Sequence, residues 1–172
     1  MMPRLRPLQL AFFALLALAL GSAFWQHAHL PARVATHFDG AGHANGWLDR
    51  GTHTTLQIAT LLFMTALFQG LAALNRHLPK ELINVPHRDY WFAPERAAAS
   101  HDIITTMLLQ LGCAVLAFFV VLFHLIYRAN LTPTPRLDAT IWWATAVLLS
   151  VVAIVLVRLV VRFSRRSTAP AV

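Results

Sequence analysis

Residues 103–127 read IITTMLLQLGCAVLAFFVVLFHLIY, a stretch without a single Asp, Glu, Lys or Arg. A helix needs about 20 mostly apolar residues to cross the hydrocarbon core of a membrane. Three further stretches are equally free of charge: residues 7–32, 51–75 and 139–157. Because lipid offers no water to the backbone groups, we predict that all four stretches form helices. The predicted spans are residues 8–25, 54–74, 103–127 and 139–161.

The overall composition excludes an ordinary soluble domain. The chain has 172 residues, of which 58% are hydrophobic and 12% are charged, whereas soluble domains carry about 25% charged residues. We therefore predict an all-α, integral membrane four-helix bundle, with a small ordered external loop between the first two helices. We assign residues 1–166 to a single membrane domain and residues 167–172 to a disordered tail.

The basic residues do not point to nucleic acid as a partner. The net charge is +7 at pH 7, but the arginines stand at the ends of the spans, where membrane proteins concentrate them. We therefore expect a lipid bilayer around these charges. The single cysteine, Cys113, excludes both an intrachain disulfide and a cysteine-based zinc site.

The distribution of Lys and Arg predicts how the chain crosses the membrane. When both termini and the second loop are placed on one side, that side holds ten of the 14 Lys and Arg residues. Cytoplasmic loops carry the excess of basic residues, so we predict cytoplasmic termini and outward-facing first and third loops. A cleaved signal peptide is the alternative for the first span, but its apolar run exceeds the usual length of about 7–15 residues.

The third span carries a polar stripe. We predict a helix over about residues 94–128, and at about 100° per residue several polar side chains fall on one face. That face includes Asp102, Thr106, Gln110 and His124. We favour a face buried against the other helices, because small and hydrogen-bonding residues pack membrane helices together. A transport path is the alternative, since polar residues inside the membrane are often functional.

The first loop contains the most distinctive motif. Residues 30–47 read LPARVATHFDGAGHANGW, in which residues 34–38 are typical of a strand. Asp39-Gly40, Gly42 and Asn45-Gly46 are turn signals, and the last of them is of the hairpin type. We therefore predict a small ordered cap on the outer end of the bundle. Its candidate ligand-binding residues are His37, Phe38, Asp39, Gly42, Asn45 and Trp47.

Several histidines near this loop raise the question of a metal. His37, Asp39 and His43 are of the residue types that zinc accepts, although their spacing matches no strong ligand template. We favour structural roles, in which Asp39 and His37 bond to the amides of a tight turn, and we expect no cofactor. Zinc at these three residues is the alternative.

The second loop contains another motif, NVPHRDYWFAPER, at residues 84–96. Its Tyr-Trp-Phe run is typical of an aromatic anchor at the membrane interface, with Arg88 and Arg96 beside lipid head groups. A docking or catalytic set in the cytoplasm is the alternative. The residues of this cytoplasmic motif are Asn84, Pro86, Tyr90, Trp91, Pro94, Glu95 and Arg96.

Together, the two motifs resemble a known bacterial family. The pattern Leu-Pro-x-x-Val-Ala-Thr-His-Phe-Asp-Gly-x-Gly-x-x-Asn-Gly-Trp at residues 30–47 resembles domain of unknown function 1648, which stands at the front of SdpI-type immunity proteins. The pattern Asn-x-Pro-x-x-x-Tyr-Trp-x-x-Pro-Glu-Arg at residues 84–96 is similar to its companion motif. The resemblance implies a protein of the bacterial inner membrane. In SdpI itself it implies protection against a secreted toxic peptide, coupled to sequestration of a transcriptional repressor.

These observations favour a non-enzymatic sensor or immunity-type protein. We expect it to bind an extracytoplasmic peptide or envelope signal at the outer loop and a protein partner in the cytoplasm. The sequence has no Gly-rich phosphate loop and no familiar serine- or zinc-hydrolase signature, so no catalytic residue is predicted. One alternative is a metal-dependent hydrolase or transferase that uses His37, Asp39 and His43. The other is a small transporter that uses the stripe from Gln110 to His124.

Overall fold

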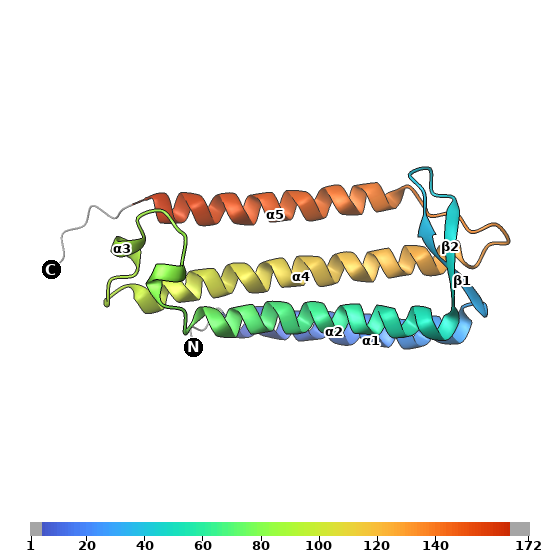
Figure 1. The fold of residues 1–172 in the computed structure, drawn as a ribbon, viewed down its shortest axis with the longest axis horizontal. Coiled ribbons are helices and arrows are strands. Elements are labelled where there is room, and N and C mark those ends of the chain that lie inside the picture. The colour runs from blue at the N-terminus through green and yellow to red at the C-terminus, as the bar shows by residue number, and fades with distance from the viewer. Residues whose placement is uncertain (1–4, 166–172) are drawn as a thin grey trace.

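The computed structural model describes residues 5–165 and contains four long helices (Figure 1). These are α1 (Leu5–His29), α2 (Arg50–Asn75), α4 (Ala97–Ala129) and α5 (Thr140–Ser164). Two strands, β1 (Arg33–Phe38) and β2 (Ala44–Asp49), join α1 to α2, and the short helices η1 (Lys80–Leu82) and α3 (Arg88–Trp91) precede α4. All four long helices are long and apolar enough to cross a membrane, which confirms the predicted membrane bundle. The tail predicted at residues 167–172 lies outside the described residues.

Helix α4 is the centre of the bundle. It contacts α1, α2 and α5, and α1 also contacts α2, whereas α5 packs mainly against α4. Figure 1 shows α4 between α5 on one side and the pair of α1 and α2 on the other. The β-hairpin lies at one end of the bundle, while α3 and both ends of the described chain lie at the opposite end.

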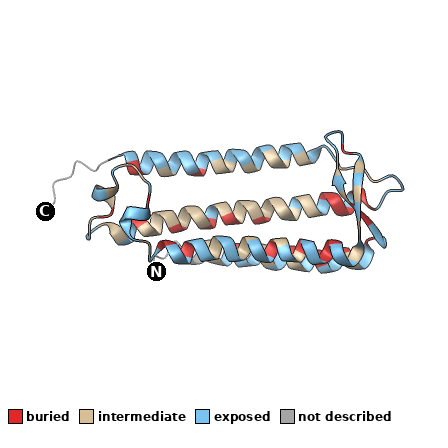
Figure 2. Ribbon diagram, in the orientation of Figure 1, coloured by how far each residue is buried: buried red, intermediate tan, exposed pale blue. Residues whose placement is uncertain are grey.

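The main apolar core lies where α1, α2 and α4 meet. Phe12 of α1, Leu61 of α2 and Leu109 of α4 are almost fully buried there. Gly112 of α4 allows the neighbouring helices to come close, because a Cβ at this position would lie 2.9 Å from Cγ of Phe68. Small residues at such crossings are typical of membrane helices. Figure 2 shows buried residues along α2 and α4, whereas α5 is largely exposed.

Side-chain hydrogen bonds also join the three core helices. Nε2 of Gln57 in α2 donates to Oε1 of Gln26 in α1 at 3.2 Å, and both side chains are almost fully buried. Nδ2 of Asn75 in α2 donates to Oγ1 of Thr105 in α4 at 3.1 Å. Such bonds between membrane helices are worth about 0.6 kcal/mol each on average. Their main effect is therefore to define how the helices are aligned.

The polar stripe of the third span is not the buried face of α4, so that prediction was wrong. The buried face includes Thr105 and Leu109, whereas Gln110 and His124 are exposed. At about 100° per residue the two faces lie about 90° apart. Periodicity identifies residues that share a face, but it does not say which neighbour covers that face. Here α1 and α2 cover the apolar face, and Thr106 turns toward the groove beside α5.

Two predicted boundaries also differ from the structure. The hairpin turns at residues 39–42, while Asn45 and Gly46 lie inside β2, where Gly46 is paired with His37. The turn forms at Asp39 and not at Asn45-Gly46, because the Asp39 side chain accepts hydrogen bonds from the amides of the turn. Helix α4 begins at Ala97, three residues after the predicted start, because the segment before it forms a separate turn.

Candidate functional site

Asn130 ties the hairpin to the end of α4. Its Oδ1 accepts a hydrogen bond from the Ala35 N–H at 2.7 Å, and its Nδ2 donates to the Ala35 carbonyl at 2.9 Å. Nδ2 also donates to the carbonyl of Ile126, in the last turn of α4, at 2.9 Å. Asn130 and Ala35 are both buried. Because the Asn130 side chain bonds to both the N–H and the carbonyl of Ala35, it replaces the backbone of a neighbouring strand at the edge of β1. Sequence reasoning missed Asn130, because an asparagine that follows a helix is an ordinary terminator.

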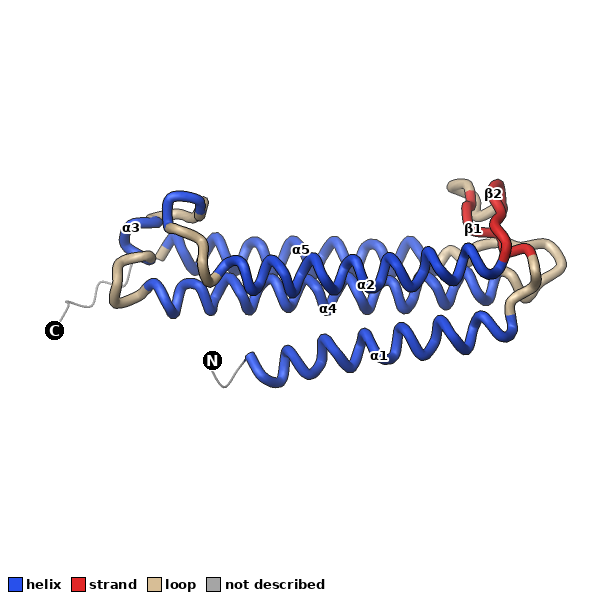
Figure 3. The backbone as a smooth tube through the Cα atoms, turned by 60° about the horizontal axis from the view of Figure 1, so that its bottom comes forward, coloured by secondary structure: helices blue, strands red, loops and turns tan. Residues whose placement is uncertain are grey.

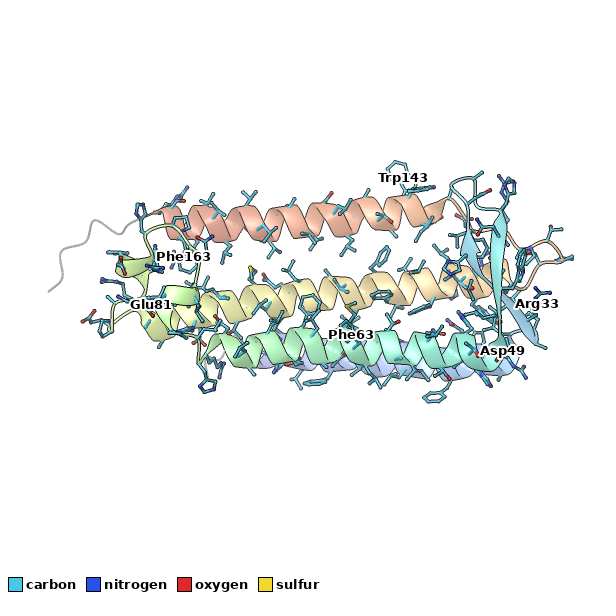
Figure 4. All side chains as sticks on the ribbon, viewed as in Figure 1. Arg33, Asp49, Phe63, Glu81, Trp143 and Phe163 are labelled. Carbon is cyan, nitrogen blue, oxygen red and sulfur yellow. The ribbon has the colours of Figure 1, made fainter. Side chains whose placement is uncertain are left out.

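A small apolar core holds the hairpin against the helix ends. Leu30, Val34 and Tyr127 are buried together beneath β1. Figure 3 shows the two strands at this end of the bundle, close to the loop that joins α4 to α5. In the register of the two strands, Arg33 of β1 lies opposite Asp49 of β2, at the open end of the hairpin (Figure 4). The predicted ordered cap is therefore confirmed.

Asp39 organises the turn of the hairpin. Its Oδ1 accepts hydrogen bonds from the backbone N–H groups of Ala41, at 2.9 Å, and His43, at 2.8 Å. These bonds hold the pKa of the Asp39 carboxyl below its ordinary value of 3.8, and the bond from the His43 N–H contributes most to this lowering. Gly42 follows with φ 84°, a left-handed conformation that glycine adopts without strain. The turn therefore carries a permanent negative charge at neutral pH.

This turn and the segment between α4 and α5 together line a cavity of about 580 Å³. The Leu137 N–H donates to the Gly42 carbonyl at 2.9 Å, and Arg136 donates to the Ala41 carbonyl at 3.3 Å. These bonds hold the two walls together. The side chains and backbone that line the cavity include Phe38, Asp39, Gly42, Asp138, Ile141 and Trp142.

The cavity combines acidic and apolar surface. Hydrogen bonds from Thr140 hold the pKa of the Asp138 carboxyl below its ordinary value, so Asp138 is ionised at neutral pH, as Asp39 is. Arg136 is the one basic residue on the cavity wall within the described chain. Indole and aliphatic surface from Trp142 and Ile141 lies beside these charges. Such a cavity is suited to a ligand with both a cationic and an apolar part.

The structure brings only half of the predicted ligand-binding residues to this cavity. Phe38, Asp39 and Gly42 line it. His37 is exposed on β1 opposite Gly46, and Asn45 is exposed on β2. Trp47 is 43% exposed, with the Arg33 guanidinium 5.6 Å from its ring centroid. The other wall, residues 136–142, carried no recognisable motif, and no sequence signal linked it to the hairpin.

The predicted metal ligands do not assemble in the described chain. Nδ1 of His43 lies 3.3 Å from Oδ2 of Asp39, but residues 5–165 contain no group of three or more His, Cys, Asp or Glu side chains suited to hold a metal ion. His37 belongs to the exposed part of β1 instead. The observed contact between Asp39 and His43 is a turn contact.

The second motif, at residues 84–96, connects the loop before α4 to the end of α5. Nε1 of Trp91 donates to the carbonyl of Phe163 at 2.8 Å, which joins the loop to the end of α5. Nε of Arg96 donates to the Tyr90 carbonyl at 2.8 Å, and its guanidinium lies 4.1 Å from the Tyr90 ring centroid. Phe163 is fully buried here, and Figure 4 places it and Glu81 of η1 at this same end. The remaining motif residues are less enclosed: Pro86 is half-buried, and Asn84, Pro94 and Glu95 are exposed.

We expect the Asp39 turn to loosen only in acid. The folded pKa lies below the ordinary value of 3.8, so the ionised carboxyl stabilises the turn. This contribution is complete above the ordinary pKa and is lost as the pH falls through the lower folded value. The amide chemical shift of His43 is expected to titrate with a midpoint below 3.8, and Asp39→Asn is expected to abolish this step. A midpoint at or above that value would contradict the assignment.

Comparison with known proteins places part of the chain in a family. Residues 12–68 match the family model described as domain of unknown function (DUF1648), a segment that contains the hairpin motif but not the motif at residues 84–96. The comparisons with curated proteins and with solved structures found no match to this chain. The resemblance predicted from residues 30–47 is thus confirmed: residues 12–68 of this chain, which has four helices long and apolar enough to cross a membrane, match the model of this domain of unknown function.

Proposed function

We propose that this protein is a non-enzymatic, sensor- or immunity-type binding protein for a cationic, amphipathic peptide outside the cytoplasm. The observation that carries the proposal is the cavity between the hairpin turn and residues 136–142. Asp39 and Asp138 supply two carboxylates to its wall, and Trp142 supplies apolar surface. A peptide with alternating basic and apolar side chains satisfies both kinds of surface at once.

The proposed location is the cytoplasmic membrane of a bacterium, with both termini in the cytoplasm. Ten of the 14 Lys and Arg residues lie at the termini and in the loop at residues 76–96, on the side that basic residues favour. The hairpin lies at the opposite end of the bundle from these segments (Figure 1), and its turn lines the cavity. In this orientation the cavity opens to the outside.

Helix α4 offers a route from the proposed peptide site to the cytoplasmic motif. Its last turn is joined to β1 through Asn130. At its first turn, Oγ of Ser100 donates to the Trp91 carbonyl at 2.7 Å. If peptide binding displaced the hairpin, α4 would move with it and shift the loop that contains Trp91. That loop is the proposed contact for a protein partner in the cytoplasm.

One labelling experiment tests both the orientation and the binding. Ala41→Cys is placed in a Cys113→Ala background, because Ala41 is exposed and lines the cavity. In spheroplasts, a membrane-impermeant maleimide is expected to label this cysteine, and a short amphipathic Lys/Leu peptide is expected to protect it. Leu82→Cys is the matched control at the other end, since Leu82 is 69% exposed. This control is expected to react only after permeabilisation.

Asp138→Asn checks the electrostatic part of the binding. Asparagine retains an oxygen that accepts from the Thr140 N–H, so the start of α5 should stay intact. Removing one exposed charge pair is expected to lower the apparent affinity of the protecting peptide by about two- to fivefold. Equal protection by a Glu/Leu peptide of the same length would overturn the proposed ligand class. Labelling of both cysteines from the same side would overturn the orientation.

A further inference from the structure

A second cavity lies between α4 and α5, near the end that carries α3. Its volume is about 670 Å³. Its polar wall contains Asp102, Thr106 and Gln110 from α4, and Arg158 and Arg162 from α5. Because Gln110 and Arg158 are both exposed, the cavity is a groove that opens on the surface of the bundle. The groove is lined by three residues of the polar stripe, which faces away from the core: Asp102, Thr106 and Gln110.

Arg158 forms no ion pair with any of the described residues. Within residues 5–165 it takes part in no hydrogen bond, ion pair or ring contact, although it directly follows the uncharged stretch 139–157. Arg162 lies one helical turn further on, on the same face, with its guanidinium 5.6 Å from the Trp91 ring centroid. A guanidinium at the edge of the hydrocarbon core is costly without an anion or water to receive it. The two arginines are therefore suited to hold an anion.

The one acidic residue of the groove does not cancel this charge. Oδ1 of Asp102 lies 3.7 Å from a guanidinium nitrogen of Arg76 in the adjoining loop, and its side chain is 22% exposed. Asp102 is thus balanced by Arg76, which is not among the residues that line the groove. The two arginines of α5 remain in excess there.

The other wall of the groove is apolar. It is formed by Ile103 and Met107 of α4 and by Val155 and Leu159 of α5. From Asp102 to Gln110 the groove extends over nine residues of α4, whose eight steps of 1.5 Å span about 12 Å. That length fits a phosphate and glycerol at the arginine end and the upper part of an acyl chain beside Met107. A free phosphate would leave the apolar wall uncovered.

We propose that this groove binds an anionic phospholipid, whose phosphate is held by Arg158 and Arg162. Basic pockets between membrane helices on the cytoplasmic side are suited to such head groups. The occupant follows from the chemistry of the walls: a fixed anion is required at one end and an alkyl chain along the rest. This site is separate from the peptide cavity, since the two cavities share no lining residue and the hairpin lies at the opposite end of the bundle from α3 (Figure 1).

The test uses the purified full-length protein in a neutral detergent. Thermal unfolding is measured with added phosphatidylglycerol, with phosphatidylcholine of the same acyl chains, or with inorganic phosphate. Phosphatidylglycerol is expected to raise the unfolding temperature, whereas the other two additives leave it unchanged. Native mass spectrometry is expected to find phosphatidylglycerol retained on the protein. Stabilisation by inorganic phosphate alone would identify a free-anion site, and equal stabilisation by both lipids would identify a non-specific apolar surface; either result overturns the proposal.

Arg158→Gln is the decisive variant, because Arg158 makes no hydrogen bond, ion pair or ring contact within residues 5–165. Its unfolding temperature without lipid is expected to equal that of the parent, and its apparent affinity for phosphatidylglycerol is expected to fall about fivefold. Arg158→Lys is expected to retain most of the binding. Arg128→Gln, at the hairpin end of α4 and exposed, is the matched control and is expected to bind as the parent does. Unchanged lipid binding by Arg158→Gln, or an equal loss in Arg128→Gln, would refute the site.

Discussion

Replacing Gly112 with valine is expected to lower the free energy of unfolding by about 3 kcal/mol, the upper end of the cost of overpacking a core. A Cβ at this position would lie 2.9 Å from Cγ of Phe68 and closer still to the ring of Phe12. Phe12 is fully buried, so its ring has little room to move. Because the two rings belong to α1 and α2, the added methyl groups would push both helices away from α4. Unfolding of the purified protein by a denaturing detergent measures the change.

Two other helical glycines provide matched controls. Gly21 in α1 and Gly70 in α2 have no heavy atom within 4 Å of a built Cβ. Their replacement by alanine is expected to be neutral, or to stabilise the helix by up to about 1 kcal/mol. Gly112→Ala is expected to destabilise despite its better helix propensity. If Gly112→Ala behaved like Gly70→Ala, the close packing of α1, α2 and α4 around Gly112 would be contradicted.

The second large effect is expected for Asn130→Ala, which should cost about 2–3 kcal/mol. Alanine removes all three hydrogen bonds of the side chain, and the N–H and carbonyl of Ala35 would stay buried without these partners. An unsatisfied buried polar group costs about 1–3 kcal/mol. The hairpin is therefore expected to separate from α4 before the helices do. Hydrogen exchange at Ala35 should become much faster, while exchange at Leu109 changes little.

Thr134→Ala is the control for this prediction. Thr134 is exposed in the same connection between α4 and α5, and its carbonyl, which accepts from Thr132, is unaffected by the change. Its exchange pattern is expected to match that of the parent. If Asn130→Ala also left the exchange of Ala35 unchanged, the side chain would not be what holds β1 to the bundle.

Much of the architecture follows from local sequence. Each uncharged stretch is about as long as a membrane span requires, or longer, so the helices at residues 54–74 and 103–127 can be predicted from each segment alone. The hairpin motif is also local, since Asp39 and Gly42 determine their turn within a few residues. Local sequence does not say which of the turn signals in this loop forms the hairpin turn, because Asp39-Gly40 and Asn45-Gly46 compete and the pairing of β1 with β2 decides between them.

The candidate sites depend on contacts between distant residues. The peptide cavity needs both the hairpin and residues 136–142, and the bond from Leu137 to Gly42 that joins them spans 95 residues of sequence. The lipid groove likewise needs Arg158 of α5 beside Gln110 of α4. Asn130 has a function in the fold only because Ala35 lies next to it. Nothing in the neighbourhood of any one of these residues identifies its partner.

By itself, the sequence determined the class of the protein, the number of its long helices and the ordered cap, because hydropathy and turn formation act over one segment at a time. Only the tertiary structure decided which face of α4 is buried, where the two cavities form and which predicted residues line them. The reason is that four apolar helices resemble one another along their length. Their order around α4 is set by close approach at Gly112 and by side-chain pairs such as Asn75 with Thr105, which depend on segments far apart in the chain.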